Sequence, residues 1–168
     1  PRTVSSAASD VYKRQHGEST CEDGFYTAGQ DETDDVVAAI SWLKDKGVKS
    51  SNIGLYGSSL GGLVALMTPA KSDDFGSIAV IDPPVDFKTL VREEMAYQGL
   101  PTFLWEPIYH YAGIFKGVNM LKDIPEEALA KGNKQPLLIF TGLLSERVQP
   151  HHSCLLYTSP SPRDSLES

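Results

Sequence analysis

Gly57-Ser58-Ser59-Leu60-Gly61 is the stretch of sequence that decides the fold. A strand-like run, residues 52–56, precedes it, and a run of small and apolar residues, 62–67, follows it. A strand, a G-x-S-x-G turn and a helix in this order are the setting of a nucleophile elbow, which exposes the serine hydroxyl. The flanking glycines remove Cβ atoms that would clash in so tight a turn. The pattern predicts a nucleophilic Ser59, and the alternative is an ordinary Gly/Ser turn.

Both ends of the chain resemble translated sequencing-adapter sequence. The two adapter-like strings are residues 5–15 and 154–164. Such segments are set aside before the fold is considered. We therefore expect a tail at 1–15, a partial domain at 16–152 that belongs to a longer chain, and a second tail at 153–168. The alternative for each end is a disordered polar tail.

Composition narrows the classes of protein that the chain can belong to. The net charge of −7 disfavours non-specific binding to nucleic acid. No apolar run approaches the length of a membrane span. Cys21 is the only cysteine outside the adapter-like ends, so there is no disulfide framework and no Cys/His metal spacing. These features favour a cytoplasmic protein and imply no cofactor and no metal.

An amphipathic helix is expected before the elbow. The acidic cluster at residues 31–35 suits a helix N-terminus, where negative charge meets the positive end of the helix dipole. Residues 36–47 continue the helix and end at a glycine. One helical stripe, which we expect to face the core, comprises Val36, Ala39, Ile40 and Leu43.

Apolar strands and helices then alternate. We expect strands at 52–56, 77–81 and 136–142, and a helix from Leu60 to about Thr68. This alternation predicts an α/β fold with a mostly parallel sheet covered by helices on both faces. Ligands of such sheets bind beyond the carboxyl ends of the strands, where Ser59, Asp82 and the loop after Gly142 lie.

Residues 87–134 are too long for a simple crossover and rich in aromatic side chains. We expect them to form helical excursions above the sheet, a cap that roofs a site or merely packs onto the body. The aromatic residues in question are Tyr97, Phe103, Trp105, Tyr109, Tyr111 and Phe115. They favour a hydrophobic substrate group.

Four stretches together resemble the α/β-hydrolases, nearest to the serine aminopeptidase-like and monoacylglycerol-lipase-like group. Residues 16–19 resemble the end of an R-G-H-G-x-S loop, and 32–36 resemble the helix that follows it. The elbow lies at the expected distance beyond. Residues 142–152 resemble the G-x-x-D-x-x-V-P loop that carries the triad acid.

That resemblance implies a serine hydrolase acting on a small-molecule acyl ester or amide. Ser59 would attack the acyl carbon, with a histidine as base and a carboxylate that orients the histidine. The backbone N–H of Leu60 would donate one hydrogen bond to the oxyanion.

The acid position departs from the family pattern, because Ser145 stands where the family has aspartate. Glu146 and Asp82 are the candidate acids. The alternative for Glu146 is a solvated surface charge, and the alternative for Asp82 is an aspartate that stabilises a turn. Because of Ser145, a second hypothesis also remains, namely that the protein is a non-catalytic α/β-hydrolase-like binding protein.

The catalytic histidine is expected beyond residue 152, because the triad order in this fold is serine, acid, histidine. His151 and His152 are expected to begin the next helix rather than to act as the base. His16 resembles a family loop residue, and His110 is expected to pack in the cap.

Overall fold

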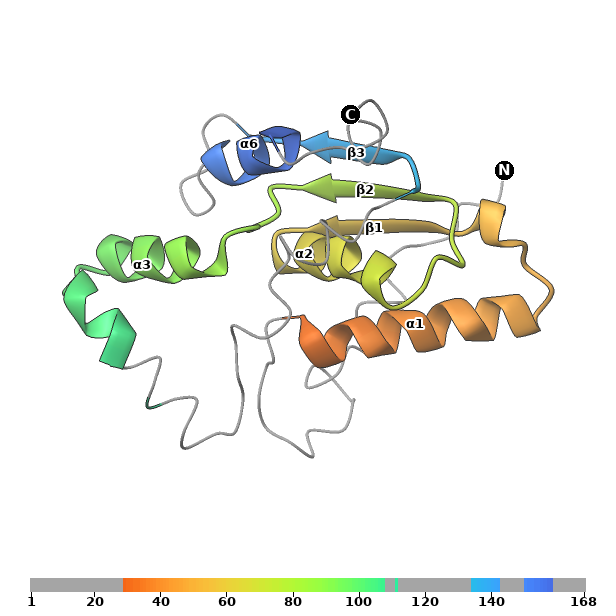
Figure 1. Cartoon of the computed structure of the whole chain (residues 1–168), viewed down its shortest axis with the longest axis horizontal. Helices are drawn as coiled ribbons and strands as arrows, with labels where there is room; N and C mark the ends of the chain where they lie inside the picture. Colours follow the sequence, from red (N-terminus) through yellow and green to blue (C-terminus); the bar gives the residue numbers. More distant parts are fainter. Residues whose placement is uncertain (1–28, 108–110, 112–133, 143–149, 159–168) are drawn as a thin grey trace, which may run out of the picture.

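The computed structural model describes residues 29–107, 111, 134–142 and 150–158. Three strands form one sheet, with helices placed between and beyond them (Figure 1). The predicted tail at 1–15 lies outside the described residues. None of the described helices is long and apolar enough to cross a membrane.

Helix α1 spans Gln30–Asp45 and begins earlier than its first apolar residue. Gly29 caps it in the left-handed region with φ 100°, and the Gly29 N–H donates to the Glu32 carboxylate at 2.9 Å. The acidic cluster therefore lies inside the first turns of the helix, as the dipole favours. Thr33 is fully buried, and its hydroxyl donates to the Gly29 carbonyl.

The predicted apolar stripe of α1 is correct except at one position. Ile40 is buried, and Val36 and Leu43 pack against the core. Ala39 is exposed, so its assignment to the stripe is wrong. Successive residues of a helix are turned by about 100°, so once Ile40 faces inward its neighbour Ala39 points aside.

The sheet contains β1 (Gly54–Ser58), β2 (Ser77–Ile81) and β3 (Leu137–Phe140) in that spatial order. Both pairings are parallel. In Figure 1 the arrows of the strands point the same way, and α3 and α6 lie beyond their heads. The predicted α/β class with a parallel sheet is confirmed.

Helix α2 (Leu60–Met67) continues into the short helix η3 (Thr68–Ala70). Helix α2 packs against α1 and against one face of the sheet. The buried core lies between these two helices and the sheet. That core is formed by Ile40, Ile53, Ala65, Leu66, Phe75, Ile78, Val80 and Val85. On the other face the register aligns Tyr56 with Ala79 and Leu138. Tyr56 and Leu138 are 71% and 54% exposed.

Helix α3 (Phe87–Tyr97) begins where the predicted cap begins. Asp86 caps it by accepting from the Thr89 N–H at 3.0 Å. The short helix η4 (Thr102–Leu104) follows. Residues 108–110 and 112–133 of the predicted cap lie outside the described residues, so the cap stays a prediction.

Helix α6 (Pro150–Thr158) crosses the expected boundary at 152–153. Leu156 packs against the core, which gives that segment a place in the fold although we expected a tail there. The other short helix, η2 (Ser50–Asn52), leads into β1, so the first strand spans Gly54–Ser58 and the expected bounds of 52–56 are wrong by two residues.

Candidate active site at the carboxyl edge of the sheet

Ser59 lies at the corner between β1 and α2. Its backbone has φ 50° and ψ −123°, and the residue is exposed. Residues other than glycine rarely adopt such a positive φ, and holding a residue in that conformation costs about 1–3 kcal/mol. Strain of this kind persists only where the surrounding structure enforces it, and it is common at functional sites.

Two backbone hydrogen bonds enforce the corner. The Ser59 N–H donates to the Ile81 carbonyl at 2.8 Å, which extends the ladder between β1 and β2 by one residue. The Ser59 carbonyl accepts from the Leu63 N–H at 3.1 Å, which starts helix α2. Ser59 is therefore held by the sheet on one side and by the helix on the other, so the hydroxyl is not needed to cap α2. Indeed, its side chain makes no capping hydrogen bond within the described part of the chain.

The glycines explain why strand and helix can meet so closely. A Cβ on Gly57 would lie 2.1 Å from the carbonyl oxygen of Gly61. A Cβ on Gly62 would lie 3.3 Å from the carbonyl oxygen of Gly57 and 3.5 Å from Cβ of Val80. Helix α2 thus passes directly over β1 and β2, and its N-terminal N–H groups point toward the region beyond Ser59. Leu60 is the first residue of that helix, as the predicted oxyanion donor requires.

Asp82 lies at the matching position one strand along. It follows the last residue of β2 and has φ 44°; among the described residues other than glycine, only Ser59 and Asp82 have positive φ. The Asp82 N–H donates to the Phe140 carbonyl at 3.0 Å, and its carboxylate accepts from the Gly142 N–H at 2.7 Å. This carboxylate therefore joins the ends of β2 and β3, which agrees with the turn role weighed above and leaves its role as triad acid a prediction.

Other residues singled out in the sequence lie outside the described residues. They are His16, Cys21, His110, Ser145 and Glu146. Glu146 as triad acid stays a prediction.

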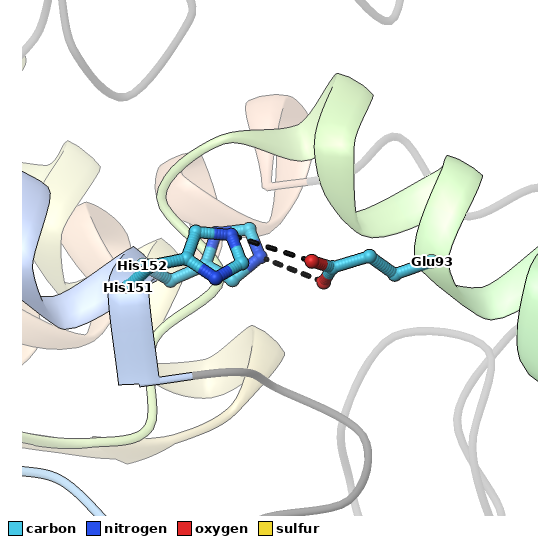
Figure 2. Close-up of side chains that lie close together, drawn as sticks. All are labelled: Glu93, His151 and His152. Carbon is cyan, nitrogen blue, oxygen red and sulfur yellow. Dashed lines mark hydrogen bonds and ion pairs between the residues drawn. The ribbon is translucent and has the colours of Figure 1, made fainter.

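His151 and His152 lie in the first turn of α6, so the expectation that they begin the next helix is confirmed. They do not stand alone. Both reach Glu93 of α3: His151 Nε2 lies 3.4 Å from Oε1 and His152 Nε2 lies 3.3 Å from Oε2 (Figure 2). We did not predict Glu93, because nothing local in the sequence marks a partner 58 or 59 positions away.

Comparisons with known proteins agree with the fold. Residues 14–161 match the model of the prolyl oligopeptidase family. The esterase Pf2001 of Pyrococcus furiosus is similar in two crystal forms. One is 25% identical with a TM-score of 0.55 and 86% of this chain covered; the other is 24% identical with 0.60 and 90%. The chain spans about half of that esterase, 52% of its length. No curated protein matched the sequence significantly. The serine aminopeptidase-like resemblance stays a prediction, since the matching family is another one.

Proposed function

Because the chain belongs to the prolyl oligopeptidase family and has an α/β-hydrolase fold, we propose that the whole protein is a serine hydrolase with Ser59 as nucleophile. The observation that carries this proposal is the strained and exposed Ser59 between β1 and α2. An ordinary Gly/Ser turn gives no reason to hold a serine at φ 50°.

The proposed reaction follows from what the corner offers. Ser59 Oγ attacks the acyl carbon of an ester or amide while a histidine base takes its proton, and an acyl-enzyme forms. The N–H of Leu60 donates to the oxyanion, and losing one such donor typically costs about 100- to 1000-fold in rate. Water then releases the acid and regenerates the serine.

Two carboxylates remain candidates for the residue that orients the base. Asp82 lies at the carboxyl edge of the sheet beside the Ser59 corner, and its bond from Gly142 keeps it an acceptor. Glu146 follows Ser145 in the loop that the family resemblance associates with the acid. Replacing each by its amide, Asp82→Asn and Glu146→Gln, separates them, because only loss of the true acid leaves the base in the wrong tautomer.

A fluorophosphonate probe tests the proposal on the whole protein. We expect covalent labelling of wild type and none of Ser59→Ala, with Ser58→Ala as the matched control that keeps its label. Hydrolysis of p-nitrophenyl butyrate and of an aminoacyl p-nitroanilide then distinguishes ester from amide substrates. A folded whole protein that does not label at Ser59 overturns the proposal.

Ser145 supports a second candidate, a binding protein of the same fold without catalysis. A serine at the acid position cannot carry the negative charge that stabilises an imidazolium. This candidate predicts that the whole protein binds acyl ligands, and that neither Asp82→Asn nor Glu146→Gln changes any labelling rate.

A further inference from the structure

A cluster of three side chains joins α3 to α6. Glu93 presents both carboxylate oxygens to two imidazoles, one at 3.4 Å and the other at 3.3 Å. All the potential ligand atoms lie within 4.8 Å of one another. In Figure 2 the two rings overlap, one behind the other, and both point toward the carboxylate. We propose that Glu93, His151 and His152 bind a divalent transition metal ion of the Zn²⁺ type.

The donor set suits such an ion. Imidazole nitrogen and carboxylate oxygen are ordinary zinc ligands, with bonds of about 2.0–2.2 Å. Two ligands of a tetrahedral ion are then about 3.3–3.6 Å apart. Each imidazole nitrogen already lies at that distance from one of the two Glu93 oxygens, and the potential ligand atoms all lie within 4.8 Å of one another, so the ion requires the side chains to draw together.

Burial differs across the cluster in a way that fits three protein ligands and one water. The side chain of His152 is 0% exposed, Glu93 is 28% exposed, and His151 is 47% exposed. The rings stack with centroids 4.4 Å apart, which limits how far either can rotate. The site is therefore anchored on the inner side and open to solvent on the outer side, where a water can complete the coordination.

Without the ion, hydrogen bonds hold the cluster, and the metal must compete with them. The Asp86 N–H donates to Nδ1 of His152 at 3.3 Å, so the neutral ring carries its proton on Nε2 and donates it to Glu93. When Nε2 binds the metal, a proton moves to Nδ1 and the contact with Asp86 opens. Breaking that hydrogen bond lowers the metal affinity, compared with a site in which the second ring N–H of each histidine donates to a carbonyl.

Binding would connect parts of the chain that are distant in sequence. Glu93 lies on the helix that follows β2, and the histidines lie on the last described helix. An ion shared by both helices stabilises the folded state, because the unfolded chain does not hold the three ligands together. This role is independent of Ser59 and of any hydrolase activity.

The test uses the full 168-residue chain in a Cys21→Ser/Cys154→Ser background, so that no thiol binds the probe. We titrate ZnCl₂ by calorimetry, follow the visible absorption of CoCl₂, and measure the thermal midpoint. We expect one ion per chain, a tetrahedral Co²⁺ spectrum and a raised midpoint with Zn²⁺.

Glu93→Gln and His151→Gln should each weaken binding by at least about tenfold. Glu106→Gln removes an exposed carboxylate that is not part of the cluster and should change nothing. Circular dichroism verifies that each variant is folded; His152 is left in place because it is fully buried. Absence of binding by the cysteine-free chain, or equal binding by all three variants, overturns the proposal.

Discussion

The close passage of α2 over β1 makes Gly57 the most sensitive position of the corner. A Cβ there would meet backbone atoms only: Gly61 O at 2.1 Å, Gly61 C at 2.3 Å and Gly62 N at 2.6 Å. Ordinary non-bonded contacts begin near 3.5 Å, so strand and helix would have to separate by more than about 1 Å. No side-chain rotation relieves this overlap.

Overpacking of a core typically costs about 1–3 kcal/mol, and a backbone obstacle places Gly57→Ala at the upper end, about 3 kcal/mol. For a chain of this size each kcal/mol lowers the thermal midpoint by about 2–4 °C, so we expect a fall of about 6–12 °C. Urea and thermal unfolding followed by circular dichroism measure the change.

Gly61→Ala is the matched control four residues away. A Cβ on Gly61 meets nothing within 4 Å, so the expectation that both flanking glycines avoid a clash is wrong for Gly61, which lies inside α2. Alanine is the better helix former, so this variant should gain about 0.5–1 kcal/mol. If Gly57→Ala is as stable as wild type, or if both variants lose the same stability, the inferred contact between strand and helix is wrong.

Three further changes test the edge of the sheet and the surface. Asp82→Ala should lose about 1–2 kcal/mol in urea unfolding, since it removes the solvent-exposed acceptor of the Gly142 N–H and puts alanine at a positive φ, whereas Asp82→Asn should lose less; equal losses would contradict this. Ser59→Gly should be about 1 kcal/mol more stable than Ser59→Ala, because glycine tolerates φ 50°; equal stability would remove the argument from strain. The hydrogen bond from Lys44 lowers the pKa of Asp74 below 3.8, so this pair stabilises the fold above that pH and the contribution disappears as the pH falls through the lowered pKa. Asp74→Asn should therefore flatten the acid side of the stability–pH profile, and an unchanged profile would show that the pair contributes nothing.

Features that depend on neighbouring residues were predictable from the sequence. Strand β2 has the predicted bounds, 77–81, because a glycine precedes it and Asp82-Pro83 ends it. The Ser59 corner was predictable for the same reason, since the glycines that permit it lie within three positions of it. Local sterics decide both features.

Features that depend on distant partners were not predictable. The Asp82 carboxylate reaches a backbone N–H 60 positions away, and His152 meets Glu93 across 59 positions. No periodicity or turn signal marks such contacts, because they arise only when separate strands end at one edge of the sheet. Ala39 shows the same limit on a smaller scale, since the exact rotation of α1 depends on what it packs against.

The spatial order β1-β2-β3 repeats the order in which these strands leave the ribosome. Each newly made strand joins a neighbour that already exists, and none of these strands has to be inserted between two others that are already paired. Loop closure is therefore limited to one crossover at a time, which keeps its entropic cost low. Vectorial synthesis and assembly of this sheet can proceed in step, so that β1 with α2 acts as the template on which the later strands are laid down.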